Sequence, residues 1–211
     1  MGTHDGAGGG NLAAALVQAA EGLITERGPQ GFSLREVARR AGVSEAAPYW
    51  HFANKEALLA AVAEAGFSDL AAAMEGMRRR IKDPDRRLRE IGVAYVRFAV
   101  AHPAHFRIMF GPEIADKAAH PALKEAAKQA FGLLVSVITD ARRGGQVRGS
   151  GVEEMTVAAW ALVHGLSALL IDRQLERHGH SAREVETLAR RVTRLLQTGL
   201  GPRPAKVRGG G

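Results

Sequence analysis

Residues 33–59 read SLREVARRAGVSEAAPYWHFANKEALL, and this stretch decides the fold that the sequence predicts. Ser33 opens a capping box with the glutamate three positions later, a pattern that satisfies free N–H groups at a helix start. The helix that follows is expected to end at Gly42, and Ser44 is expected to cap a second, very short helix that ends at His51. Two short helices joined by a tight glycine turn have the length and spacing of a helix-turn-helix.

The rest of the chain also has the pattern of helices. Apolar residues recur at intervals of three and four, and strand-like alternation of apolar and polar residues is not seen over a strand's length. We therefore predict an all-α fold of about nine helices, in which an N-terminal three-helix module contains the helix-turn-helix and a larger helical region follows.

Caps, glycines and prolines mark the expected helix boundaries. A first helix is expected over 11–27, and a long helix is expected to begin after the Asn54 cap. Prolines at 84, 103 and 121 restart the chain, and a second capping box begins at Ser181. The glycine-rich ends are expected to be disordered, because they contain little apolar surface to offset the entropy of ordering.

Residues 155–171 carry no charged side chain, and they form the only segment that we expect to resemble a membrane span. The segment is short for that purpose, contains four polar or amphipathic side chains and is flanked by charges. We predict a helix that is buried on all sides by protein.

Composition excludes several classes of protein. The 211 residues include no cysteine, which excludes disulfides and thiolate chemistry, and residues 1–10 lack the pattern of a signal peptide, so we expect a cytoplasmic protein. The net charge of +7 does not locate a nucleic-acid site, because residues 1–55 hold five cations and five carboxylates. Residues 121–211 hold 14 cations and 8 carboxylates, and so contain most of the excess.

The helix-turn-helix concentrates groups that bind DNA. A short second helix fits the major groove, and hydroxyl, imidazole and ammonium groups near helix ends bind phosphate oxygens. The predicted phosphate contacts are Ser33, Ser44, Tyr49, His51 and Lys55. The predicted base contacts are Glu45, Ala46 and Trp50, since an alanine methyl suits thymine.

This stretch resembles the helix-turn-helix of the TetR (tetracycline-repressor-like) transcriptional regulators. The matching elements are the GVS turn at 42–44, the YWHF run at 49–52 and the KEALL helix start at 55–59. Trp160 followed by His164 and Gly165 is similar to the WHG-type C-terminal domain of a TetR subgroup. Pro48 stands where many members have an aliphatic residue, and we expect it to distort the second helix locally.

The resemblance implies a domain organisation and a function. It predicts a disordered tail at 1–10, a DNA-binding domain at 11–55, an effector-binding and dimerisation domain at 56–201 and a disordered tail at 202–211. It implies a homodimeric repressor that a small-molecule effector releases from operator DNA, with no cofactor and no membrane partner. The apolar period and small residues of 155–171, together with the wide apolar stripe of 185–199, predict the dimer interface.

Inward-facing aromatic residues with a few polar groups also predict an apolar effector pocket, although filling of the core explains the same residues. The candidate pocket residues are Tyr95, Phe98, His102, Phe106, Met109, Phe110, Phe131, Ile138, Trp160 and His164.

Enzyme and metal chemistry have little support in the sequence. It contains no GxSxG, Walker-type or GxGxxG motif and no HxxxH or HExxH pair, so we predict neither catalysis nor a metal site. The alternatives are a helical enzyme, a ligand-binding protein without DNA binding and a structural adaptor.

Overall fold

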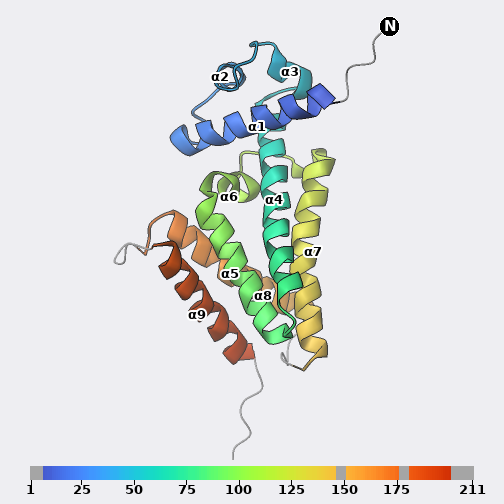
Figure 1. The fold of residues 1–211 in the computed structure, drawn as a ribbon, viewed down its shortest axis with the longest axis vertical. Helices are drawn as coiled ribbons and strands as arrows, with labels where there is room; N and C mark the ends of the chain where they lie inside the picture. The colour runs from blue at the N-terminus through green and yellow to red at the C-terminus, as the bar shows by residue number, and fades with distance from the viewer. Residues whose placement is uncertain (1–6, 146–150, 176–180, 201–211) are drawn as a thin grey trace, which may run out of the picture. The chain divides into compact units, whose positions relative to one another are not determined.

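The computed structural model describes residues 7–145, 151–175 and 181–200, and these residues form helices and connecting turns without a strand (Figure 1). The predicted all-α fold is confirmed for this part of the chain. Its elements are α1 (Ala7–Arg27), α2 (Leu34–Arg40), α3 (Ala47–His51), α4 (Lys55–Arg80), α5 (Pro84–Ala101), α6 (Pro103–Phe110), the 3₁₀ helix η1 (Lys117–Ala119), α7 (Pro121–Arg143), α8 (Val152–Ile171) and α9 (Ala182–Leu200).

Three of the predicted helix caps are confirmed. The N–H of Glu36 donates to Ser33 Oγ over 3.4 Å, and the N–H of Ser33 donates to the Glu36 carboxylate over 2.9 Å. Asn54 Oδ1 accepts from the N–H of Ala57 over 2.8 Å, which caps α4. The second capping box, at Ser181, begins α9. Local hydrogen bonding of this kind needs only neighbouring residues, which is why sequence predicts it well.

The predicted cap at Ser44 is wrong. Helix α3 begins at Ala47 with Ala46 as its N-cap, and Ser44 instead accepts the Ala47 N–H on its backbone carbonyl over 3.0 Å in a turn. A helix capped by Ser44 would need the N–H of residue 48 to donate to the Ser44 carbonyl, and proline has no N–H. Pro48 therefore shortens α3 and lies inside its first turn, where proline is tolerated.

The predicted N-terminal tail is also partly wrong. Residues 7–10 belong to α1, because each residue added to an existing helix gains a backbone hydrogen bond. Residues 1–6 and the predicted C-terminal tail at 202–211 lie outside the described residues.

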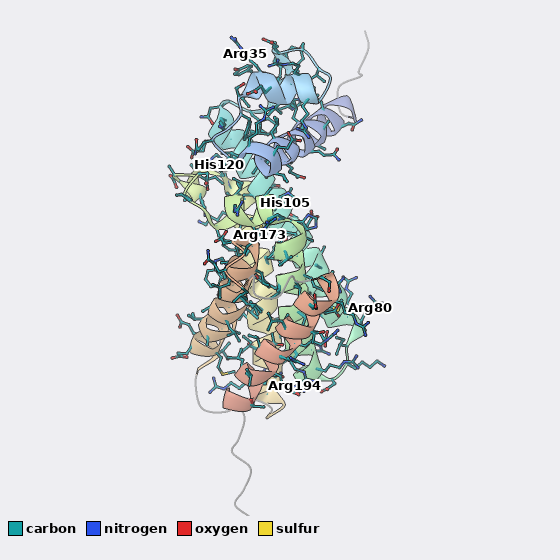
Figure 2. All side chains as sticks on the ribbon, turned by 90° about the vertical axis from the view of Figure 1, so that its left-hand side faces the viewer. Arg35, Arg80, His105, His120, Arg173 and Arg194 are labelled. Atoms are coloured by element: carbon teal, nitrogen blue, oxygen red, sulfur yellow. The ribbon has the colours of Figure 1, made fainter. Side chains whose placement is uncertain are left out.

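The chain divides into two compact units. The first comprises residues 1–69 and 101–130, and the second comprises residues 70–100 and 131–211. Within the first unit, α1 packs on α2, α3 and α6. A Cβ atom on Gly66 of α4 would lie 2.7 Å from Met109 Sδ, so α4 and α6 approach closely there. His105 of α6 is buried, and its Nε2 lies 2.8 Å from the Glu21 carboxylate of α1; Figure 2 labels this histidine.

The second unit is built around α5, whose side chains from Ile91 to Val96 are buried. A Cβ atom on Gly92 would lie 2.7 Å from Thr193 Cγ2 of α9 and 3.3 Å from Val163 Cγ1 of α8. Helices α8 and α9 also pack on each other, and both lie beside α5 in Figure 1. This close approach leaves room only for glycine at position 92.

Helix α8 differs from its prediction. It is not buried on all sides, because Val157 is 53% exposed and Leu169 is 45% exposed, and Ala158 and Ala161 are exposed as well. Both α8 and α4 are long and apolar enough to cross a membrane. This is weak evidence for a membrane span, because the core helices of soluble proteins have the same length and composition. The expectation that residues 155–171 were unique in this respect is therefore wrong: all charges of α4 except those of Glu64 and Asp69 lie near its ends, and the residues between are mostly apolar.

Candidate nucleic-acid interface

The helix-turn-helix is held by a small apolar core. Val37 and Ala38 of α2 have no exposed surface, and Ala47 and Pro48 of α3 are buried. Gly42 joins the two helices with a φ of +71°, a left-handed conformation that a side chain disfavours. The turn therefore fixes α3 against α2.

Because Ala47 and Pro48 face inward, the remaining side chains of α3 face outward. Trp50 is 74% exposed and Tyr49 is 53% exposed, and His51 is exposed too. The candidate residues that precede the helix, Ser44, Glu45 and Ala46, are exposed as well. Pro48 thus shortens the helix without turning its aromatic residues inward.

Two candidate residues also have roles within the protein. Ser33 caps α2, and its Oγ donates to the Glu36 carboxylate over 3.0 Å. Lys55 Nζ donates to the carbonyls of Phe32 and Gln30 over 2.8 and 3.4 Å and lies 4.3 Å from the centre of the Phe32 ring. Burial lowers the pKa of Lys55. An ammonium group has three N–H donors, so one remains for a phosphate.

The sequence analysis missed two cations of α2 that could bind DNA, Arg35 and Arg39. A third cation, Arg40, is not available, because it donates two hydrogen bonds to the Glu26 carboxylate over 2.7 and 2.6 Å. Arg39 is exposed without a hydrogen bond or ion pair among the described residues, and Arg35 reaches Glu45 only at 3.7 Å. Arg35 projects outward from α2 in Figure 2. The zero net charge of residues 1–55 gives no sign of Arg35 and Arg39, but their spacing of four residues places them on one face of the helix.

Comparisons with known proteins agree with this geometry. Residues 16–62 match the family described as "Bacterial regulatory proteins, tetR family", and residues 88–196 match "Tetracyclin repressor-like, C-terminal domain". The second match alone covers more than half of the 211 residues. The chain belongs to the TetR family.

Relatives within the TetR family match in two ways. The tetracycline repressor protein class A from transposon 1721 of Escherichia coli is 50% identical over 50 residues, which are 24% of this chain and 23% of that protein. The chain thus aligns with about a quarter of the length of this curated relative. A Rhodococcus protein of unknown function is similar in fold over 94% of this chain and 100% of its own, with a TM-score of 0.78 and 33% identity.

A second TetR-fold neighbour was solved with a ligand. The structure of the Bacillus subtilis regulator FadR in complex with stearoyl-CoA covers 88% of this chain and 98% of its own, with a TM-score of 0.73. Its sequence identity is 16%, so the similarity concerns the fold.

Four of the ten effector-pocket candidates form a cluster in the second unit of this TetR-family chain. Tyr95 Oη lies 3.0 Å from His164 Nδ1, and Trp160 Nε1 donates to Tyr95 Oη over 3.4 Å. The rings of Phe131 and Trp160 meet edge to face at 6.0 Å. Burial lowers the pKa of His164 and raises that of Tyr95, so both side chains are neutral near pH 7.

The other six candidates are not part of this cluster. Phe98 and Ile138 are buried in the second unit. The remaining four belong to the first unit: His102, Phe106, Met109 and Phe110. The ring centres of Phe106 and Phe110 lie 5.2 Å apart, and His102 is exposed. A cavity of about 30 Å³ in the second unit is lined mostly by apolar side chains and includes Tyr95. That volume is close to one water molecule, so the cavity would have to expand to hold an effector.

Proposed function

We propose that this TetR-family protein is a transcriptional repressor that binds operator DNA as a homodimer and is released by a small-molecule effector. The observation that supports DNA binding best is α3, a five-residue helix that exposes Tyr49 and Trp50 while its other face packs on α2. Large aromatic side chains with this exposure are typical of a binding surface. The regulator acts in the cytoplasm and has no catalytic activity.

In the proposed complex α3 enters the major groove. Ser33, Ser44, Tyr49, His51 and Lys55 bind phosphates, and Glu45, Ala46 and Trp50 meet base edges. Arg35 and Arg39, which are exposed on α2, add phosphate contacts. Phosphate contacts fix the orientation of the protein, and base contacts select the sequence.

The dimer would form through the exposed apolar side chains of α8 and α9. Val157 and Leu169 are exposed on α8, and Leu195 of α9 is 70% exposed. Ala161 and Gly165 lie between the first two, so a partner backbone can approach closely. Exposed apolar side chains on neighbouring helices are typical of a covered face.

The proposed effector is apolar or weakly polar, and it binds beside Tyr95, Phe131, Trp160 and His164. This cluster combines aromatic surface with a short chain of neutral polar groups, which suits a ligand that carries one or two polar atoms. The Bacillus subtilis FadR structure contains stearoyl-CoA, and only the stearoyl chain of that ligand is apolar, so compounds with a long acyl chain are the ones to test first.

DNA binding is tested by selecting fragments from a random duplex pool and measuring their affinity by fluorescence anisotropy. We expect a selected, inverted-repeat sequence that binds more tightly than random DNA, with an affinity that falls as salt rises. Trp50→Ala should reduce the preference for the selected sequence over random DNA, whereas Arg142→Ala, a substitution at an exposed position of the second unit, should not. A protein that enriches no sequence and binds no duplex would instead be an adaptor, an enzyme or a ligand carrier.

A further inference from the structure

The second unit also contains an open, charged pocket, which we call the basin. Its volume is about 560 Å³, and it is lined by the end of α4, the turn to α5 and residues of α5 and of the first half of α9. A volume of this size is typical of small-molecule sites. The lining residues are Met77, Arg80, Ile81, Lys82, Asp83, Arg86, Glu90, Val93, Ala94, Arg97, Glu186 and Arg190.

The basin contains unpaired positive charge. Seven cationic side chains occur between positions 78 and 89, and four of them are bound inside the protein. Arg78 and Arg79 donate to the Glu75 carboxylate over 2.5 and 2.8 Å. Arg87 donates to two backbone carbonyls, and Arg89 binds Asp85 and Gln197.

The other three cations of this run are Arg80, Lys82 and Arg86. Their side chains have no hydrogen bond or ion pair to any residue that the structure describes, and all three line the basin. Arg80 is the last residue of α4 and lies at the edge of the ribbon in Figure 2. The fold thus neutralises the cations that point elsewhere and leaves the ones that face the basin.

The carboxylates of the basin do not neutralise these cations. Glu90 accepts two hydrogen bonds from Arg190 over 3.1 Å each, and Glu186 accepts one over 2.6 Å. Asp83 caps α5, because its carboxylate accepts from two backbone N–H groups over 3.2 and 3.3 Å. Five cations against three engaged carboxylates leave the basin positive.

The floor of the basin is apolar. Val93 and Ala94 of α5 are buried there, and Met77 and Ile81 are half-buried. Arg190, held by two carboxylates, adds a planar guanidinium to the lining. A planar guanidinium and an apolar floor both favour a flat aromatic body over a fully solvated ion.

We propose that this basin binds a nucleoside 5′-polyphosphate. The phosphates lie among Arg80, Lys82 and Arg86, where guanidinium and ammonium groups form charge-assisted hydrogen bonds. The base lies on the half-buried side chains of Met77 and Ile81. The basin shares no residue with the predicted DNA contacts or with the Tyr95 cluster, so it would give the regulator a second signal.

The test is isothermal titration calorimetry of the full chain with ATP, ADP and AMP. We expect saturable binding of ATP that weakens from ATP to AMP and with rising salt. The triple variant of the basin combines Arg80→Gln, Lys82→Gln and Arg86→Gln. It should weaken ATP binding by about tenfold or more, because it removes the side chains that bind the phosphates. The matched control Arg79→Gln, Arg142→Gln, Arg143→Gln makes the same change in net charge outside the basin and should bind ATP like the wild type.

Circular dichroism checks that both triple variants are folded, and the single variant Lys82→Gln, at an exposed turn position, replaces the triple if it is not. Equal ATP binding by the basin variant and the wild type would overturn the proposal, as would AMP binding as tight as that of ATP. A basin variant that loses affinity for random duplex DNA but keeps ATP binding would show that this face meets nucleic acid instead.

Discussion

Ser33 and Ser44 look equivalent in the sequence, since each precedes a short helix, yet only one of them acts as a cap. Ser33 forms a complete capping box, whereas Ser44 is exposed and contributes only its backbone carbonyl to a turn. We expect Ser33→Ala to lower the free energy of unfolding by about 1 kcal/mol, the usual value of such a cap. Ser44→Ala should change it little. Urea unfolding of the two variants measures this difference, and an equal loss in both would show that Ser44 also caps α3.

The reason that sequence could not separate the two serines is Pro48. The capping box depends on residues three apart and is visible in the sequence, but the start of α3 depends on which N–H is missing. Lys55 shows a related limit: its position after a helix cap suggested a phosphate contact, and its two carbonyl partners near residue 30 became visible only in the fold.

Lys55 should therefore affect both stability and DNA binding. Lys55→Ala removes two hydrogen bonds from a charged donor and should lower the free energy of unfolding by about 1–3 kcal/mol. It should also reduce the slope of log affinity against log salt by about one, because one ionic phosphate contact is lost. Tyr49→Phe should weaken binding to all sequences without changing that slope. Anisotropy titrations at several salt concentrations measure both effects, and an unchanged slope for Lys55→Ala would leave this residue with its structural role alone.

At the scale of the element, the C-terminal end of α4 contributes to the free energy of unfolding by an amount that depends on pH. Hydrogen bonds from Arg78 and Arg79 lower the pKa of Glu75 from its ordinary value of 4.5 to about 2. A carboxyl group with a lowered pKa in the folded state stabilises the fold above pH 4.5, and this contribution is lost as pH falls towards 2. We expect Glu75→Gln to cost about 1 kcal/mol at pH 7, since these pairs are partly solvated, and almost nothing near pH 2. Urea unfolding at pH 7, 4.5 and 2.5 tests this, and a cost independent of pH would contradict it.

Helix α8 shows how far an apolar pattern can be interpreted. Seventeen residues without a charge indicated burial, and Met155, Thr156, Val163 and Ser167 are indeed buried in this chain. Val157 and Leu169 are exposed in the single chain. An apolar residue can be buried by its own chain or, in the proposed dimer, by a second copy, and both cases give the same sequence pattern. One chain's sequence cannot separate these two kinds of burial.

At the scale of the whole molecule, this exposed surface predicts a dimer. Leu188→Arg together with Leu195→Arg places two charges on the outer side of α9, opposite the residues that meet α5. We expect sedimentation to show a dimer for the wild type at micromolar concentration and a monomer for this variant, with loss of operator binding. The control Gln129→Arg with Ser136→Arg adds the same charge to exposed positions of α7 and should remain dimeric. A monomeric wild type would exclude the interface.

Release from DNA requires an effector that distinguishes two arrangements of the molecule, because a ligand that binds both equally shifts neither. Helix α4 contributes residues to both compact units, so a shift of α4 is a direct covalent route between them. The Tyr95 cluster is the proposed effector site, and Trp160 within it is a fluorescent probe, because its ring packs against Phe131 and its N–H donates to Tyr95 Oη. The chain has only one other tryptophan, Trp50, so Trp50→Phe protein reports Trp160 fluorescence alone. We expect an apolar effector to change that fluorescence at the concentration at which it releases operator DNA from wild-type protein, with a loss of affinity of roughly 5- to 150-fold. Tyr95→Phe should shift both midpoints together, because it removes the hydroxyl between Trp160 and His164. A compound that releases DNA from wild-type and Trp160→Phe protein equally, without changing the Trp160 signal, would place the effector site elsewhere in the molecule.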